Sequence, residues 1–349
     1  MKRRLAFFLL PLPFLLVLTS RAETPALGLE QVLSADTRLL VFSPHPDDAT
    51  LGAGGLIQHV LQVGGAVEVV YMTSGDGYPE GIRAKDHILQ PTAQDFRAYG
   101  VLRQDEALHA LATLGVQKRE VIFLGFPDRG LCAILRHYWA DKPPYYMSPY
   151  TLEDRPPLGD VLLPHTEYDG GDLKREVTSV LGNFRPTVVV VTHPRDPHPD
   201  HCATYSVVRG AVQALEERDP TFHPLFLTFL IPFGQWPTSP GTDGGASLFP
   251  PVGFSETDGI RISFPLSPVE VTTKRQALLQ HHSQMAVMAP YLLSFVRANE
   301  LFSGKIVSQT TDDPCRRVVD SKRLTGPLQY SHTPHTFVPH RVRQAGGFF

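Results

Sequence analysis

The sequence of 349 residues is short of three features that mark particular classes of protein. Its three cysteines include no CxxC pair, the usual sign of a cysteine zinc site or a redox motif. The chain contains 32 Lys and Arg and 35 Asp and Glu without a basic block, so the sequence indicates no nucleic-acid-binding surface. After Leu18 no stretch is long and apolar enough to cross a bilayer. The chain could form one disulfide and leave one thiol, and spacing does not fix which residues pair among Cys132, Cys202 and Cys315.

The N-terminus has the features of a secretory signal. A basic start, Met-Lys-Arg-Arg, is followed by the almost wholly apolar run Leu5–Leu18 and by Ser20 and Ala22 at small-x-small spacing. We therefore predict residues 1–22 as a signal peptide, cleaved near Ala22, and export to the periplasm or the extracellular space. An uncleaved membrane anchor is the alternative, but the run is short for a span and contains two prolines.

The remaining chain alternates short apolar runs with segments of helical pattern. The short β-branched and apolar runs predict strands at 38–42, 66–72, 120–124, 187–192, 225–231 and 260–264. Helices are expected at 50–61, 92–114, 171–181, 201–215, 268–283 and 290–302. Strands and helices joined by single crossovers predict an α/β fold. We expect a Rossmann-like, mainly parallel sheet flanked by helices, with extra strands, long loops and C-terminal helices.

We predict one domain over residues 36–303, interrupted by two inserted loops at 129–170 and 233–259, and a flexible tail at 325–349. The first loop is rich in Tyr and Pro between Tyr138 and Tyr150. A connection of this length inside a compact domain is usually a lid or a binding loop. Its aromatic rings suit the apolar face of a sugar, and packed Pro/Tyr structure is the equally supported alternative.

Two short polar segments each follow an apolar strand: Ser-Pro-His-Pro-Asp-Asp at 43–48 and His-Pro-Asp-His at 198–201. The carboxyl ends of parallel strands form the edge at which open α/β sheets bind ligands. His45 and Asp48 are three residues apart and can face one point as the chain enters a helix. With His201 they offer three N/O ligands and leave a fourth position open, as a catalytic zinc requires.

The polar residues beside these ligands suggest catalytic roles. Asp47 can act as the general base on a water molecule, and His198 can stabilise an oxyanion or protonate a leaving amine. Plainer interpretations stand beside these: an Asp at a helix start is often an N-cap, which is the role we expect for Asp200. His193 and Asp196 are either orienting groups behind the ligands or ordinary loop residues.

The two segments together resemble the PIG-L/LmbE-like family of zinc-dependent N-deacetylases, whose motifs are A-H-P-D-D-E and H-P-D-H. Further segments fit the family pattern: Arg103–Ala107 with Leu114-Gly115, Leu124–Asp128, Lys274–Gln284 and Asn299–Phe302. The resemblance covers roughly residues 36–303. It implies Zn²⁺, or another divalent metal such as Fe²⁺, held by the three ligands named above, with Asp47 as the base and His198 at the oxyanion.

The resemblance also implies supporting roles and a substrate class. Arg103 and Glu106, at i and i+3, are expected to meet as a buried pair near the site, with Asp128 as a weaker candidate for the pocket wall. Members of the family hydrolyse the acetamide of N-acetylglucosamine units in conjugates, so we expect an N-acetylated sugar or glycoconjugate as substrate. The sequence does not indicate the oligomeric state.

One position departs from the family pattern. Ala49 stands where the family usually has Glu, which puts activity or substrate range in question but leaves the ligands in place. Two alternatives to sugar N-deacetylation therefore stay open. One is an amidase acting on a larger sugar-conjugate amide, and the other is a carbohydrate-binding relative with impaired catalysis.

Overall fold

The structure, a computed structural model, describes residues 28–139, 142–237, 245–254 and 260–304. The predicted signal peptide, the predicted tail and Cys315 lie outside these residues, as do parts of the predicted loop 233–259. None of the helices within the described ranges combines the length and apolar character that a membrane span requires.

A seven-stranded sheet forms the centre of the molecule, with strand order β3-β2-β1-β4-β5-β7-β6. The strands are β1 (Arg38–Ser43), β2 (Ala66–Thr73), β3 (Val121–Phe126), β4 (Val188–Thr192), β5 (Leu225–Phe229), β6 (Ile260–Pro265) and β7 (Asn299–Ser303). Strands β1 to β5 pair in parallel, whereas β7 runs antiparallel to both β5 and β6. The predicted fold class, a mainly parallel sheet flanked by helices, is confirmed.

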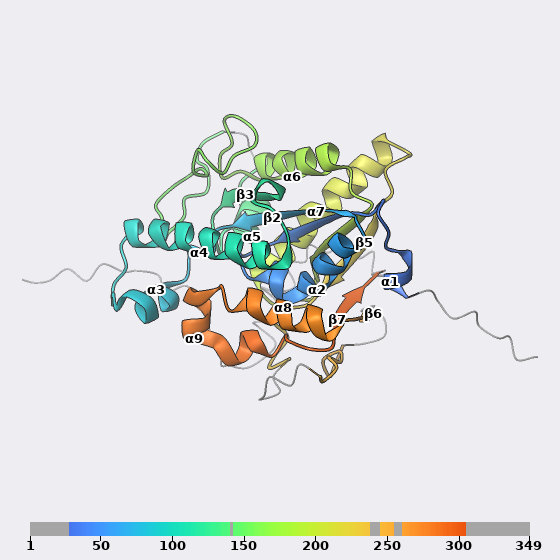
Figure 1. The fold of residues 1–349 in the computed structure, drawn as a ribbon. Coiled ribbons are helices and arrows are strands. Elements are labelled where there is room, and N and C mark those ends of the chain that lie inside the picture. Colours follow the sequence, from blue (N-terminus) through green and yellow to red (C-terminus); the bar gives the residue numbers. More distant parts are fainter. Residues whose placement is uncertain (1–27, 140–141, 238–244, 255–259, 305–349) are drawn as a thin grey trace, which may run out of the picture.

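Helices cover both faces of the sheet (Figure 1). They are α1 (Leu29–Val32), α2 (Asp48–Gln62), α3 (Pro79–Asp86), α4 (Ala93–Leu114), α5 (Leu131–His137), α6 (Gly170–Phe184), α7 (Pro199–Arg218), α8 (Pro268–Leu278) and α9 (His282–Leu293), with a 3₁₀ turn at Lys118–Glu120. One core joins the sheet to α2, α4 and α8, and a second core on the other face joins it to α5, α6 and α7.

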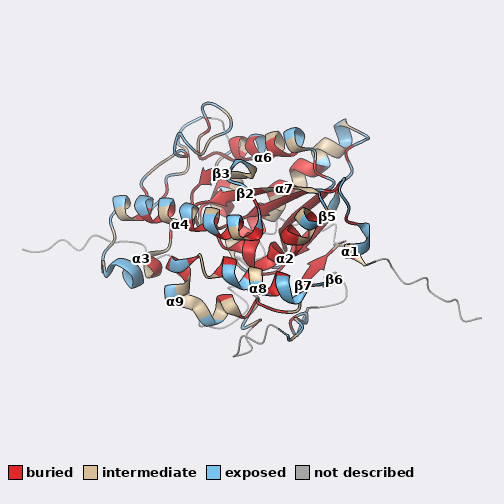
Figure 2. Cartoon of the chain, viewed as in Figure 1, coloured by how far each residue is buried: buried red, intermediate tan, exposed pale blue. Residues whose placement is uncertain are grey.

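Strands with two covered faces explain the near-continuous apolar runs of the sequence. In β1, Leu39 and Val41 enter the first core, while Leu40 and Phe42 enter the second. Figure 2 shows the same arrangement, with a buried sheet and helices whose exposed faces point outward. The predicted cap of the long helix is confirmed, because Thr92 forms a capping box with Asp95 and the helix ends at Gly115, where φ is 99°.

The C-terminal helices differ from the prediction. The predicted helix 268–283 is interrupted, because α8 ends at Leu278 and α9 begins at His282. The predicted helix 290–302 is wrong after Leu293, where α9 ends, and Asn299–Ser303 forms β7 between β5 and β6. Pairing with two strands supplies the backbone hydrogen bonds of this segment, and tertiary context overrides a local helical pattern.

The predicted loop 129–170 also contains structure that the sequence did not indicate. Its first residues form α5, a short helix whose N-cap, Gly130, has no side chain that could signal a helix start. The ends of the excursion that follows lie together, because the amide of Gly170 donates to the carbonyl of Tyr138 at 2.6 Å. Between these ends the connection stays in contact with the fold, because Thr151 and Asp160 accept hydrogen bonds from Arg97 and Gln104 on α4, at 2.6 and 2.7 Å.

Candidate metal centre

The two polar segments meet where the strand order reverses. Strand β1 lies between β2 and β4, so the chain leaves β1 and β4 toward helices on opposite faces, α2 and α7. This is the topological switch point at which open α/β sheets bind ligands, and it brings residues 43–48 beside residues 198–201.

Three side-chain atoms from these segments form a nearly equilateral triangle. His45 Nδ1 lies 3.0 Å from Asp48 Oδ2 and 3.1 Å from His201 Nε2, and the last two atoms are 3.2 Å apart. Tetrahedral zinc with bonds of about 2.0–2.1 Å places its ligands roughly 3.3 Å from one another. The three atoms therefore already have close to the spacing that a zinc ion requires, and they leave one face of the triangle for a fourth ligand.

Two further carboxylates lie beside the second nitrogen of each donor imidazole. His201 Nδ1 lies 2.9 Å from Asp196 Oδ2, and His45 Nε2 lies 3.1 Å from Asp128 Oδ1. A carboxylate on the second nitrogen of a metal-binding histidine fixes its tautomer and ring orientation. Asp128 and Asp196 are thus placed to orient the donor histidines, and both are buried.

The electrostatics of the cluster favour a cation. Burial alone would lower the pKa of His45, but Asp128, Asp200 and Asp48 raise it well above its ordinary value. For His201, burial is likewise outweighed by Asp196 and Asp48, which raise its pKa to about 10. The pKa of Asp48 is lowered, because its contacts with both histidines outweigh its burial. In the absence of metal, protons on the two histidines balance the charge of the neighbouring carboxylates, and a divalent cation can take the place of these protons.

Asp47 precedes α2 at its N-cap position but makes no side-chain cap bond. Its Oδ1 instead lies 2.9 Å from Nη2 of Arg103, and both side chains are buried. Burial lowers the pKa of Arg103, but the neighbouring Asp47 raises it, so this arginine remains a cation. Arg103 also donates from Nη1 to the carbonyl of Gly75 at 2.9 Å, which fixes the guanidinium in one orientation.

The expected contact between Arg103 and Glu106 is not formed, although both side chains are buried. Arg103 points toward Asp47, and Glu106 accepts hydrogen bonds from the amide and the hydroxyl of Ser283, at 2.8 and 2.6 Å. Residues i and i+3 share one side of a helix, but here they bind different neighbours on that side. Glu106 thereby joins α4 to the start of α9.

His198, rather than Asp200, is the N-cap of α7, so the prediction for Asp200 is wrong. The Nδ1 atom of His198 accepts from the amide of Asp200 at 3.2 Å, which leaves the proton of the neutral ring on Nε2. Burial and the neighbouring His45 and His201 lower the pKa of His198 well below its ordinary value. A ring nitrogen of His198 lies within 4.8 Å of one on each of those histidines.

Asp200 has a different structural role. It lies inside α7, and its carboxylate accepts from the amides of Arg129 and Leu131, at 2.5 and 3.2 Å, while Oδ2 lies 3.5 Å from Nε2 of His45. It thereby joins the second polar segment to the start of α5. The sequence did not indicate this role, because an Asp beside a helix start suggests a local cap, whereas the actual partners are 69 and 71 residues away.

His193 lies in the same loop but is not among the triangle atoms. Its Nδ1 accepts from the amide of Arg195 at 3.0 Å, and its ring packs edge-on against Phe254 at 5.1 Å between centroids. Asp196, in contrast, accepts from the amides of His198 and Ile231, at 3.0 and 3.1 Å, in addition to its contact with His201. Of these two candidates, the structure brings Asp196 directly behind a donor histidine.

Ala49 is fully buried and belongs to the apolar core on the α2 side of the sheet. Its amide donates to Oγ of Ser43 at 2.9 Å. The side chain at this position therefore faces the core, and Ala49 contributes no atom to the triangle of donor atoms.

Part of the aromatic loop lies beside the centre. Arg129 Nη1 is 3.4 Å from Tyr150 Oη. Gly77 lies against both Tyr150 and Asp128, because a Cβ added to Gly77 would be 3.0 Å from the Tyr150 ring and 3.2 Å from Asp128. Burial and the charge of Asp128 raise the pKa of the adjacent Asp76 to about 7. The loop thus contributes at least one ring to the surroundings of Asp128.

The fold and this centre define an α/β protein with a metal-type donor set at its switch point. Residues 40–212 match the family model described as "PIG-L: GlcNAc-PI de-N-acetylase". This match covers both polar segments and confirms the resemblance of this part of the chain to the PIG-L family.

Curated relatives carry the name 1D-myo-inositol 2-acetamido-2-deoxy-alpha-D-glucopyranoside deacetylase. The protein of Mycobacterium sp. (strain KMS) is 31% identical over 202 residues, which cover 57% of this chain and 58% of the relative. The protein of Mycolicibacterium gilvum (strain PYR-GCK) is 28% identical over 271 residues, or 76% of this chain and 86% of the relative. The chain therefore spans little more than half the length of the first of these relatives.

Solved structures with similar folds include two deacetylases. A deacetylase of the teicoplanin biosynthetic pathway, solved as a triple mutant, has a TM-score of 0.49 and 19% identity, covering 79% of this chain and all of the other. The N,N'-diacetylchitobiose deacetylase of Pyrococcus horikoshii has a TM-score of 0.47 and 17% identity, covering 78% and 87% of the two chains.

Proposed function

We propose that the protein is a metal-dependent hydrolase that removes the acetyl group from an N-acetylated amino sugar or its conjugate. The observation that carries this proposal is the triangle formed by His45, Asp48 and His201, with Asp47 adjacent and held by Arg103. The match to the PIG-L family model and the names of the curated relatives support the same chemistry.

The donor set fits zinc, which His45 Nδ1, Asp48 Oδ2 and His201 Nε2 would hold. When bound, such a metal lowers the pKa of a water ligand to about 7 and polarises the amide carbonyl. Asp128 and Asp196 keep the two histidines in the orientation that presents these nitrogens. Fe²⁺ accepts the same nitrogen and oxygen donors, so the donor set alone favours no single divalent metal.

The neighbouring residues divide the proton transfers between them. Asp47 accepts a proton from the attacking water as the new C–O bond forms. The Nε2–H of neutral His198 donates a hydrogen bond to the developing oxyanion. The C–N bond then breaks, Asp47 returns the proton to the amine, and acetate and a free amino sugar leave. Neutral His198 suits oxyanion binding better than it suits a role as the acid.

The test compares Asp47→Asn with the wild-type protein. Acetate release should fall at least about 100-fold, the lower limit for losing a positioned acid–base group, while about one metal per chain remains. Asp95→Asn is the matched control, because Asp95 is an exposed capping carboxylate on α4. Full activity in Asp47→Asn would rule out Asp47 as the base, and unchanged hydrolysis by metal-free protein would overturn the mechanism.

The substrate is the part of the proposal that most needs a screen. Acetate release should be measured on a panel of N-acetylated sugars, glycolipids and cell-wall fragments, with larger acyl amides included. Cleavage of only the larger amides would favour the amidase alternative. Sugar binding without any hydrolysis would favour the carbohydrate-binding alternative.

We also propose that the protein is exported. The basic, apolar and small-residue pattern of residues 1–22 supports this, and N-terminal sequencing of the protein from a cell envelope or culture fraction tests it. A mature N-terminus close to Glu23 is the expected result. An intact Met1 in the cytoplasmic fraction would contradict the proposal.

A further inference from the structure

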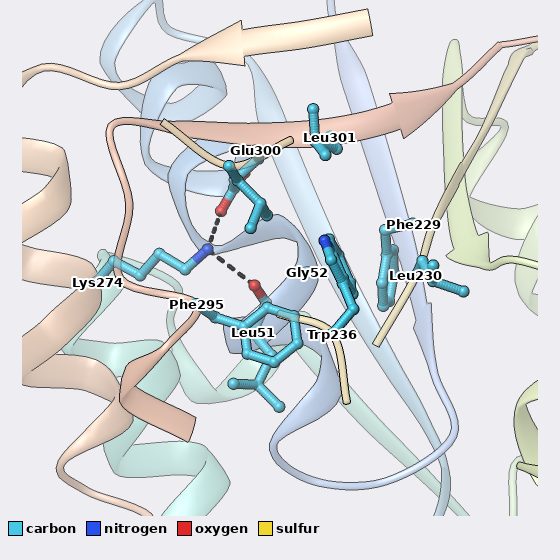
Figure 3. A pocket seen from close by; sticks show the side chains of 10 residues that line it. Leu51, Gly52, Phe229, Leu230, Trp236, Lys274, Phe295, Glu300 and Leu301 are labelled. Carbon is cyan, nitrogen blue, oxygen red and sulfur yellow. Dashed lines mark hydrogen bonds and ion pairs between the residues drawn. The ribbon is translucent and has the colours of Figure 1, made fainter. Parts of the chain in front are cut away.

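A buried ion pair lies behind the metal-type centre, and none of the roles above uses it. Lys274 on α8 and Glu300 on β7 are joined by a contact of 2.6 Å between Nζ and Oε1, and their side chains are 1% and 2% exposed (Figure 3). Apolar groups, among them Phe229, Trp236 and Phe295, line the small cavity beside them. Two charges in such surroundings are unfavourable unless each keeps its hydrogen bonds.

The partners of this ion pair are backbone groups of α2. Glu300 accepts from the amides of Gly55 and Leu56 at 2.7 and 3.0 Å, and Lys274 donates to the carbonyl of Leu51 at 2.8 Å. In a regular α-helix the amide of Gly55 pairs with the carbonyl of Leu51. The ion pair therefore binds the amide donor and the carbonyl acceptor that form one hydrogen bond in a regular helix.

The engaged backbone lies in the turn that carries the candidate ligand and base. The amide of Leu51 donates to the carbonyl of Asp47 at 3.0 Å, so the carbonyl that Lys274 holds belongs to the first turn of α2. A second contact comes from the residues after α8, where Nε2 of His281 lies 3.3 Å from Oγ1 of Thr50. The segment from α8 to the start of α9 thus contacts this turn at two successive residues.

A third contact with the turn comes from α4. Arg103 binds the carboxylate of Asp47, and Glu106, one turn later on the same helix, binds Ser283 at the start of α9. Residues 47–51 are therefore held by contacts from both α4 and the α8–α9 segment. A turn fixed in this way has its carboxylates placed before any metal arrives.

We propose that the Lys274–Glu300 ion pair is a positioning device for the metal-binding turn, acting through the carbonyl of Leu51 and the amides of Gly55 and Leu56. The proposal rests on the proposed function only for its kinetic readout. An ion pair that merely stabilised the fold would change thermal stability alone, whereas a positioning pair also changes metal affinity.

The experiment uses the double substitution Lys274→Met/Glu300→Gln, which removes both charges and keeps side chains of similar size. Zinc affinity is measured on the full chain by competition with a chromogenic chelator, and kcat and KM by acetate release. Residues that orient metal ligands from outside contribute about 10–100-fold, so we expect zinc binding and kcat each to fall about tenfold with KM unchanged.

Ser267→Ala is the matched control. Ser267 caps α8 by accepting from the amide of Glu270 at 3.3 Å, so its loss weakens the same helix and removes none of the contacts that Lys274 and Glu300 make with α2. It should lower the melting temperature and leave zinc affinity and kcat unchanged. A double variant that binds zinc as tightly as Ser267→Ala and the wild type would overturn the proposal.

A measurement on the wild-type protein keeps the proposal testable if the double variant does not fold. Hydrogen exchange of peptides covering residues 48–56 should show the same protection in the zinc-free and zinc-loaded proteins. Rapid exchange of this segment in the zinc-free protein would show that the turn is not positioned in advance. If the wild type releases no acetate from any sugar, the proposed function fails, while zinc affinity and exchange still decide the role of the ion pair.

Discussion

The contact between Arg103 and Asp47 gives the sharpest prediction. Arg103 donates to Asp47 from Nη2 and to the carbonyl of Gly75 from Nη1, so its guanidinium holds two groups in a fixed relation. Lysine keeps the charge but presents one ammonium group instead of a planar fork. The substitution Arg103→Lys should therefore lose one charge-assisted hydrogen bond in a buried place, at a cost of about 2 kcal/mol.

This magnitude leads to two measurable effects. For a unit of this size, about 2 kcal/mol corresponds to a fall in Tm of roughly 3–4 °C. If the same free energy is lost from the transition state because Asp47 is no longer oriented, kcat falls about 30-fold. We expect KM to stay within about twofold, because Arg103 is buried behind Asp47. Metal content should not change, because Asp47 is not one of the three triangle donors.

The assay is acetate release under saturating substrate, combined with thermal unfolding and metal analysis of the same preparations. Arg97→Lys is the control, since Arg97 lies on the same helix but pairs with Glu153 at the surface. An Arg103→Lys variant with wild-type kcat and a lowered Tm would refute the orienting role of Arg103. Loss of metal in this variant would show that the turn, and not only Asp47, depends on it.

Four further predictions concern metal binding, its pH dependence, acid stability and packing. Asp196→Asn should weaken zinc affinity about 10–100-fold, measured by chelator competition, because Asp196 orients His201 through Nδ1; unchanged affinity would contradict that role. Zinc affinity of the wild type should rise with pH below about 10, because zinc displaces protons from His201, whose pKa is raised to about 10, and from His45, whose pKa is also raised; a pH-independent affinity would contradict this. Burial lowers the pKa of His281 to about 4, so as pH falls below about 6.5 this histidine binds a proton in the unfolded chain before it does in the folded protein. His281 should therefore reduce the free energy of unfolding by about 3 kcal/mol between pH 6.5 and 4. The substitution His281→Gln should remove this loss from a series of urea-unfolding measurements at different pH values. Gly52→Ala should lower Tm, because its Cβ would overlap the ring of Phe229, whereas Gly182→Ala on α6 has open space and serves as control.

The sheet and the first helices could be predicted from sequence because their signals are local. The run Leu39–Phe42 is apolar on both faces, and Thr92 with Asp95 forms a cap within four residues. The segment Asn299–Ser303 could not be predicted in this way, because it becomes a strand only through pairing with β5 and β6. Periodicity describes a segment alone and contains no information about its neighbours.

The residues of the candidate centre could likewise be predicted only in part. The residues of the two polar segments could be named from sequence, since strand ends of a parallel sheet lie at a common edge. Arg103 and Asp128 could be named as candidates, but their pairings could not be predicted, because each contact joins distant positions: Arg103 to Asp47, Asp128 to His45, and Lys274 to Leu51. Helical spacing suggested that Arg103 meets Glu106, and only the packing of α4 against its neighbours shows that the two side chains bind different groups.

The meeting of the two ends of the long excursion has a practical consequence for engineering. The amide of Gly170 and the carbonyl of Tyr138 are joined by a hydrogen bond of 2.6 Å, while Asp200 separately fixes the amides of Arg129 and Leu131 at the start of α5. An exchange of the segment between Tyr138 and Gly170 would have to keep Tyr168, which is buried in the core and donates to the carbonyl of Gly125 at 3.0 Å, and Asp169, the N-cap of α6. Grafts that replace the residues before Tyr168 would test whether this loop contributes to the choice of substrate.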